Sequence, residues 1–183
     1  MADLKIMKVL FDQLIREEKR GQRFFKDAAT YADDPKVKRL FEHLSVEEEK
    51  HLSLLESMWK QITEDPKAYA EASPSTSAEM VEYAGNMQPV FVIDDTPMKN
   101  LKLPMFELFK ADEFKKLLEQ ITIRSVLQFA MKLEYDNTKY IVGFMKHIKN
   151  KRSLTILKKM ADEEKGHFIA LKRIYDGLAP GIK

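Results

Sequence analysis

Hydrophobic residues recur at steps of three and four through the first third of the chain. This period of about 3.6 residues indicates amphipathic helices, each with one buried face. The pattern predicts a first helix over about residues 4–32 and a second that continues to about Ile62. Between them, Asp34 followed by Pro35 is typical of an N-cap and the first helical position. The two helices form the predicted hairpin one, residues 3–62.

The same pattern returns near the end of the chain. It predicts a helix over about residues 122–148 with Thr122 as its cap, a short turn near Asn150, and a last helix that ends at Gly177. Preceded by a short helix at about 112–120, these helices form the predicted hairpin two.

Residues 63–111 have a different character and form the predicted crossover. They hold five of the seven prolines, and the segment at 89–94 could be a short strand or an extended connection. Hairpin two, with its short helix, then occupies residues 112–178. The sequence therefore predicts one domain over residues 1–183, an all-α four-helix bundle of two antiparallel helical hairpins joined by a long crossover.

The two hairpins repeat one pattern of polar positions. A shift of 116 residues places the first hairpin on the second without a gap, and in each half 30 residues separate a lone glutamate from a Glu-x-x-His motif. Independent surface charges would have no reason to keep this spacing. The polar positions that coincide are Glu18 with Glu134, Glu48 with Glu164, and His51 with His167.

These six residues interrupt the apolar stripes of the four helices at mid-length. Four carboxylates in an apolar core cost several kcal/mol each unless something compensates their charge, which two divalent ions would do. Oxygen and imidazole ligands together suit iron, manganese or zinc better than calcium or magnesium. One glutamate from each of two helices, with Glu-x-x-His from the others, is the ligand pattern of di-iron carboxylate bundles. The predicted metal ligands are Glu18, Glu48, His51, Glu134, Glu164 and His167.

Four segments carry a family resemblance: EEKRGQRFFKDAA at 17–29, VEEEKHLSLLE at 46–56, FAMKLEYDNTKYI at 129–141 and ADEEKGHFIAL at 161–171. Together they resemble the rubrerythrin branch of the ferritin-like superfamily, over both hairpins but not the crossover. The resemblance implies a ferritin-like bundle with two metal ions, iron before manganese or zinc. It also implies a carboxylate-bridged di-iron centre that reacts with hydrogen peroxide or dioxygen.

Two features depart from the family's pattern. The chain has no cysteine, so it lacks the rubredoxin domain of full-length rubrerythrins and its electrons would come from a separate donor protein. Rubrerythrins also usually place an extra glutamate one turn after the third-helix ligand, where this chain has Asn137, and Gly21 is the counterpart in the first half. Asn137 is therefore a candidate neighbour of the metals rather than a ligand.

Several neighbouring residues compete for these roles. Glu47 and Glu163 lie four residues before the histidines and could also face the core, although the family pattern favours Glu48 and Glu164. Glu17 could replace Glu18, but its repeat partner is Leu133, which selects Glu18.

Three other side chains are assigned by their repeat partners. Tyr140 corresponds to Phe24, which favours core packing over a place beside the metals as a hydrogen-bond donor or radical trap. His43 and His147 have no histidine partner in the repeat, so we expect them at the surface.

Composition narrows the function. A net charge of +2 with interleaved signs gives no nucleic-acid footprint, and no apolar run is long enough for a membrane span, so neither partner is expected. The absence of cysteine excludes thiolate metal sites and thiol catalysis. With no apolar signal segment at its start, the chain is expected in the cytoplasm. The long crossover could cover a neighbour, which favours a homodimer.

Together with these ligands, the rubrerythrin resemblance implies a di-iron carboxylate oxidoreductase that reduces peroxide or dioxygen. Two alternatives remain open. One is an iron-binding, ferroxidase or non-redox metal-binding protein, and the other is a metal-free interaction protein.

Overall fold

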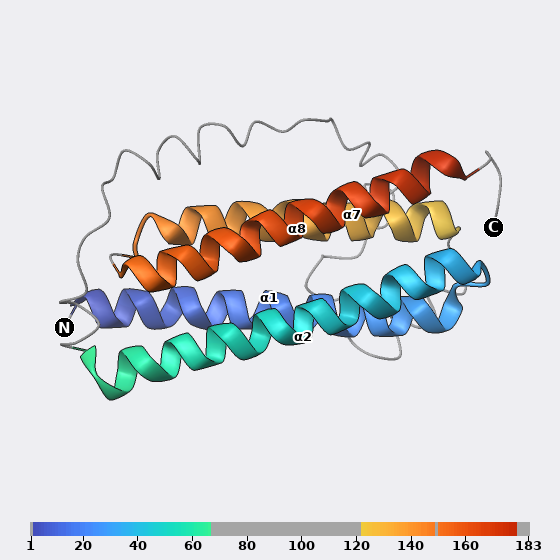
Figure 1. The fold of residues 1–183 in the computed structure, drawn as a ribbon. Coiled ribbons are helices and arrows are strands. Elements are labelled where there is room, and N and C mark those ends of the chain that lie inside the picture. Colours follow the sequence, from blue (N-terminus) through green and yellow to red (C-terminus); the bar gives the residue numbers. More distant parts are fainter. Residues whose placement is uncertain (1, 67–121, 149, 179–183) are drawn as a thin grey trace.

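A computed structural model describes residues 2–66, 122–148 and 150–178 of the chain. The described part is all-helical and contains four long helices and no strand. These helices are α1 (Ala2–Tyr31), α2 (Pro35–Glu64), α7 (Ile123–Met145) and α8 (Lys151–Gly177). They pack side by side as a four-helix bundle (Figure 1), which confirms the predicted fold class. No helix in these ranges combines the length and hydropathy needed to cross a membrane.

The four helices form two hairpins, α1 with α2 and α7 with α8, and the two helices of each hairpin are antiparallel (Figure 1). In Figure 1, α1 and α8 run in one direction along the bundle, and α2 and α7 run in the other. The end of α2 and the start of α7 therefore lie at opposite ends of the bundle, as a long crossover requires. The rest of that crossover, from residue 67, and the predicted short helix at 112–120 lie outside the described residues.

The helix starts follow the predicted capping chemistry. The Asp34 side chain accepts hydrogen bonds from the backbone N–H groups of Lys36 at 2.7 Å and Val37 at 3.2 Å. Thr122 and Asn150 cap α7 and α8 in the same way. These caps pair backbone donors that the first turn of a helix leaves without an intrahelical partner.

The third long helix is shorter than predicted, because α7 ends at Met145 rather than near Ile148. The His147 N–H donates to Phe144 O at 2.9 Å, and the Ile148 N–H donates to Met145 O at 3.1 Å. Hydrogen bonds across three residues tighten the chain beyond the α-helical path. This turn brings the chain to its cap at Asn150.

The hydrophobic core consists of two clusters, one toward each end of the bundle. One cluster includes Phe24, Phe25 and Phe41, which pack together with centroid distances of 5.1–6.4 Å. The other includes Phe11 and Phe144, in edge-to-face contact at 4.8 Å. The helices present a polar layer between the two clusters, and this layer contains the predicted metal ligands.

Candidate metal centre

All six predicted metal ligands are buried in the middle of the bundle. The four glutamates have an exposed fraction of 0%, and His51 and His167 are 1% and 8% exposed. Each of the four helices contributes one glutamate, and α2 and α8 each add a histidine one turn later. Because the apolar neighbours of these residues on every stripe are buried as well, helix packing turns the carboxylates inward. The residues are Glu18, Glu48, His51, Glu134, Glu164 and His167.

The six side chains form two overlapping groups of four. In each group, one ligand atom from every residue lies within 4.8 Å of the others. Glu48 and Glu164 belong to both groups, so their carboxylates are shared between them. Applying the 116-residue shift in both directions exchanges the two groups, and the sequence repeat is thus a repeat of the site. The first group is Glu18, Glu48, His51 and Glu164, and the second is Glu48, Glu134, Glu164 and His167.

The imidazoles direct their Nδ1 atoms toward these carboxylates. His51 Nδ1 lies 2.8 Å from Glu164 Oε1 and 3.4 Å from Glu18 Oε2. His167 Nδ1 lies 3.6 Å from Glu134 Oε2 and 3.7 Å from Glu164 Oε2. The rings are stacked, with centroids 5.9 Å apart. Each imidazole therefore faces one glutamate that belongs to a single group and also faces Glu164, which belongs to both groups.

Despite these short distances, the inward atoms lack hydrogen-bond partners. Ten buried side-chain atoms in the described residues have no contact with hydrogen-bond geometry, and they are all eight carboxylate oxygens and both Nδ1 atoms of this cluster. Buried polar atoms are nearly always paired, because leaving one unpaired costs about 1–3 kcal/mol. Unpaired oxygen and nitrogen lone pairs that converge on shared points are suited to cations. The cluster could therefore hold a metal ion.

Burial and mutual repulsion disfavour the ionised form of three of the four glutamates. Burial raises the pKa of Glu18, and it raises the pKa values of Glu48 and Glu134 well above the usual range, with the charge of Glu164 adding to each effect. Burial acts to lower the pKa of His51, but Glu164 and Glu18 outweigh it and raise this pKa to about 11. Without a cation, protons must supply the missing positive charge.

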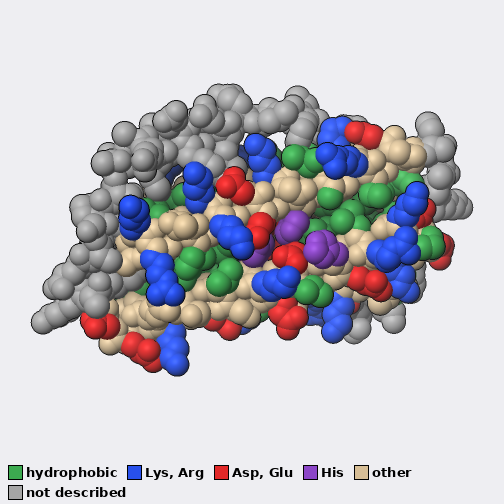
Figure 2. Space-filling view, in the orientation of Figure 1, with side chains coloured by type: hydrophobic (Ala, Val, Ile, Leu, Met, Phe, Trp, Pro, Cys, Tyr) green, Lys and Arg blue, Asp and Glu red, His purple; other side chains and the backbone are tan. Residues whose placement is uncertain are grey.

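The competition between adjacent glutamates is decided by burial. Glu48 and Glu164 are fully buried within the cluster, whereas the side chains of Glu47 and Glu163 are 17% and 32% exposed. Glu47 and Glu163 lie along the seam between α2 and α8, outside the two groups of buried side chains. Figure 2 shows histidine and acidic side chains together at the surface over this seam.

Glu17 also lies outside the cluster. It forms an ion pair with Arg20, with 3.0 Å between Oε1 and Nη1. This placement agrees with the prediction that Glu18, and not Glu17, belongs to the site. That prediction rested on the repeat, in which Glu17 corresponds to the apolar residue Leu133.

The prediction that Tyr140 packs in the core is wrong. Tyr140 is 50% exposed, although its repeat partner Phe24 is buried. Helix rotation is not the reason, since Tyr140 and Phe24 each follow the lone glutamate of their own helix by the same six residues. Phe24 is covered by Phe129 of α7, whereas Tyr140 is left half exposed. Its exposure also gives no support for a place beside the metals. Asn137, by contrast, is buried on the same stripe as Glu134.

The two remaining histidines lie outside the core. His147 is exposed, and the His43 side chain is exposed beside Glu47. The surface placement predicted for both is confirmed.

Gly21 has a role that the sequence indicates only indirectly. A Cβ atom built at this position would meet Glu48 Oε2 at 2.8 Å and Glu48 Cδ at 2.9 Å. The missing side chain thus leaves room for the Glu48 carboxylate, which both groups share. Glycine in a helix interior costs roughly 0.5–1 kcal/mol relative to alanine. In the sequence, the indication of this role is a glycine on a helix stripe whose nearest apolar residues have large side chains.

Comparisons with known proteins support the fold. No protein-family model matches the chain, and no curated protein matches it. A solved structure from Pyrococcus furiosus, described as a hypothetical protein, has a TM-score of 0.58 and 22% sequence identity to this chain. The match covers 91% of this chain and 86% of that one. This solved structure therefore shares the fold, and its description names no activity.

We expect Gly21→Ala to weaken metal binding while leaving the fold intact. The new Cβ would displace the flexible end of Glu48, and the helix would gain up to about 1 kcal/mol in propensity. Isothermal titration with Zn²⁺ should show at least about a tenfold loss of affinity, which corresponds to about 1.4 kcal/mol of binding free energy. Gly143→Ala is the matched control, since a Cβ there meets nothing within 4 Å. Unchanged affinity in Gly21→Ala would contradict this role.

The metal-free protein should lose stability as the pH rises above about 4.5. Its folded state keeps protons on Glu18, Glu48 and Glu134 that the unfolded chain releases above its ordinary carboxyl pKa of 4.5. His51 acts in the same direction, since its stabilising contribution is complete below pH 6.5 and is lost toward pH 11. Each retained proton changes the free energy of unfolding by about 1.4 kcal/mol per pH unit.

Urea unfolding with a chelator present, at several pH values, measures this slope. Saturating Zn²⁺ is the control and should reverse the trend, because metal ligands bind in their deprotonated form. A metal-free stability that increases over the same range would show that the cluster does not retain its protons.

Proposed function

We propose that this chain is a rubrerythrin-like di-metal carboxylate protein whose centre, filled by iron, reduces hydrogen peroxide or dioxygen. One observation carries the proposal: all eight carboxylate oxygens and both Nδ1 atoms of the cluster are buried without hydrogen-bond partners. Two symmetric groups that share two glutamates suggest two cation positions. The donor set of carboxylate and imidazole suits iron, with manganese and zinc as alternatives.

The bound metals would supply the redox chemistry, since two ferrous ions can give the two electrons that, with two protons, convert hydrogen peroxide to two water molecules. The protein's part is to hold and shield them. Glu18 and Glu134 would each serve one position, Glu48 and Glu164 would serve both, and the imidazoles would each complete one position. The two apolar clusters on either side keep bulk water from the layer.

Access would come from the side of the bundle, between α2 and α8. His167 is the most exposed of the six residues, and the partly exposed Glu47 and Glu163 lie along the same seam. A small oxidant such as peroxide can approach there without opening the bundle. Electrons would have to come from a separate donor protein, because no cysteine is available for a second iron site in this chain.

Metal loading is the first test of the proposal. Protein prepared without oxygen and loaded with Fe²⁺ should contain two ions per chain, and binding at a hundred times the dissociation constant should add about 2.7 kcal/mol of stability per ion. Glu48→Gln keeps the side-chain volume but removes a shared carboxylate, so it should reduce the iron content below one ion per chain. Glu49→Gln, an exposed neighbour on α2, is the matched control and should still bind two ions. Equal iron contents in the two variants would rule out Glu48 as a shared ligand.

The reaction is tested separately. One equivalent of hydrogen peroxide should oxidise both ferrous ions within seconds, which stopped-flow absorbance follows, and added reductant should restore the starting state for another cycle. Glu164→Gln removes the other shared carboxylate, so it should lower the iron content as Glu48→Gln does and leave little iron for peroxide to oxidise. Loaded protein that peroxide does not oxidise would exclude the reductase function while leaving the metal site in place.

A second candidate is iron oxidation for binding or storage. It is favoured by Asn137, which stands where rubrerythrins usually have a further glutamate and which leaves the six-residue set without an extra carboxylate. The two functions differ in what happens to excess iron. A storage protein accumulates ferric product well beyond two ions per chain when Fe²⁺ and dioxygen are supplied together. A reductase stops at two and consumes oxidant only while reductant remains.

A further inference from the structure

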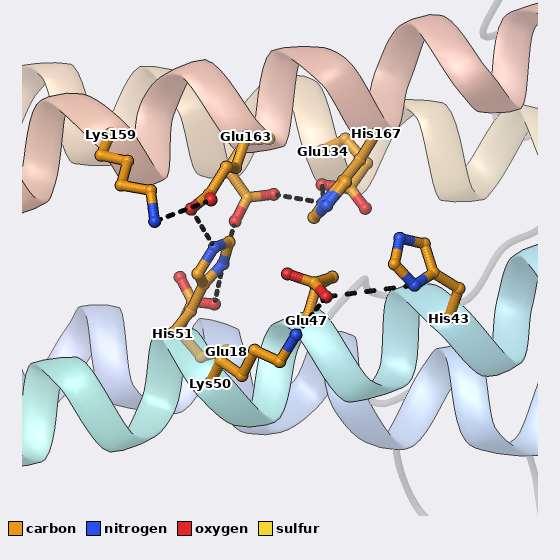
Figure 3. A network of polar contacts seen from close by, with 10 residues as sticks. Glu18, His43, Glu47, Lys50, His51, Glu134, Lys159, Glu163 and His167 are labelled. Carbon is orange, nitrogen blue, oxygen red and sulfur yellow. Dashed lines mark hydrogen bonds and ion pairs between the residues drawn. The ribbon is translucent and has the colours of Figure 1, made fainter.

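His51 lies between two consecutive glutamates of α8, one on each of its ring nitrogens. Nδ1 faces Glu164 at 2.8 Å, inside the cluster, and Nε2 faces Glu163 Oε2 at 3.2 Å, toward the seam. Figure 3 shows both contacts from α8 down to the imidazole on α2. A carboxylate can only accept from this ring, so the Nε2 contact places a proton on the outer nitrogen.

The repeat partner of Glu163 behaves differently. Glu47 accepts a hydrogen bond from Lys50 Nζ at 2.6 Å and lies 3.9 Å from His43 Nδ1. Within the described ranges, no hydrogen bond joins Glu47 to His167, the imidazole that symmetry would give it.

Two differences in the repeat account for this asymmetry. Lys50 corresponds to Gly166, so the second half lacks the lysine that holds Glu47 from three residues away. His43 corresponds to Lys159, which contacts Glu163 Oε1 at 3.4 Å and leaves Oε2 directed at His51. Local pairs on α2 thus keep Glu47 on its own helix, whereas Glu163 reaches across the seam to the other hairpin.

We propose that Glu163 is a positioning residue that orients His51 toward a metal ion, so that the two metal positions differ in affinity. The position formed by Glu18, Glu48, His51 and Glu164 binds the tighter ion. The position completed by His167 binds the weaker one. This inference rests on the proposed function, because it assumes that the cluster binds metal.

The physical basis is the tautomer of the imidazole. A histidine binds a metal through an unprotonated nitrogen, and Nδ1 of His51 is the nitrogen that faces the other ligands. Glu163 holds the proton on Nε2, fixes the ring plane and increases the basicity of Nδ1. Removing such an outer carboxylate typically lowers metal affinity by about 10–100-fold.

Burial acts in the same direction. His51 is 1% exposed and is held by residues from two other helices, whereas His167 is 8% exposed. Water therefore competes less for the ligands of the position that His51 completes.

Zn²⁺ titration of the whole chain, with a competing chelator, tests the inference. The unaltered protein should bind two ions with dissociation constants that differ by at least about tenfold, the lower limit for an outer carboxylate. Glu163→Ala should weaken the tighter ion by about 10–100-fold and bring the two affinities close together. Glu163→Gln, which keeps an acceptor oxygen, should recover part of this loss. Glu47→Ala is the matched control and should leave the tighter ion unchanged.

A second readout follows the imidazole itself. In Zn²⁺-loaded protein labelled with ¹⁵N at histidine, His51 should carry its proton on Nε2, and that proton should exchange slowly with water. In Glu163→Ala the proton should exchange rapidly, a change that a merely structural loss of packing would not produce. Because Glu163 is partly exposed, both variants are expected to fold, and circular dichroism checks this.

Three results would overturn the inference. Unchanged affinities in Glu163→Ala would do so while leaving the proposed metal site standing. So would Glu47→Ala weakening the tighter ion as much as Glu163→Ala does. A chain that binds no Zn²⁺ would overturn the proposed function together with this inference.

Discussion

Burial of like charges in a common layer is the constraint on which this structure depends. Four carboxylates with no exposed surface lie in the middle of a helical bundle, and their oxygens make no hydrogen bonds among the described residues. Such an arrangement opposes folding, since desolvation and mutual repulsion both act on it. The aromatic and aliphatic clusters at the two ends of the bundle stabilise the helices that impose this layer. Packing on both sides thus holds the six side chains of the cluster in one layer.

The duplicated sequence explains why the site consists of two similar groups that share Glu48 and Glu164. Each hairpin contributes one lone glutamate, one shared glutamate and one imidazole, and neither hairpin could complete a group of four alone. Packing of the two hairpins therefore both completes the site and buries the core. The halves have nonetheless diverged around this common set, at Gly21 opposite Asn137 and at Lys50 opposite Gly166. These differences lie in the surroundings of the ligands and not in the ligands themselves.

The fold and the cluster were largely predictable from sequence, because both depend on helical periodicity. Every ligand fell on an apolar stripe, and the repeat confirmed the spacing independently. The choice between Glu47 and Glu48 could not be made in this way, since both halves carry two adjacent glutamates and each lies within reach of the core. The crossing of α2 and α8 decides it, by burying one and leaving the other at the seam.

The error at Tyr140 has a different origin. A repeat transfers the position of a residue, whereas burial depends on what the other helices place against it. Phe24 packs against Phe129, at 5.0 Å between ring centroids, and so is covered by α7. Tyr140 lies on the same turn of its own helix in the repeat but is half exposed. Internal symmetry of the sequence is thus a sound guide to ligands, which face the shared axis, and a weaker guide to residues off that face.

The adjacent glutamates also show how a polar layer extends outward from its ligands. Sequence alone presents Glu163 and Glu164 as rivals for one role, but a helix turns consecutive residues by about 100°, so both can contact one imidazole from different sides. Glu164 faces the inner nitrogen of His51 and Glu163 faces the outer one. The presence of Glu163 beside Glu164 has a physical reason. A histidine whose Nδ1 faces a buried cluster needs an acceptor for the proton on Nε2, and Glu163 supplies it. In the other half, Lys50 and His43 contact the glutamate equivalent to Glu163 on its own helix, so the two halves differ in the contacts around their ligand sets.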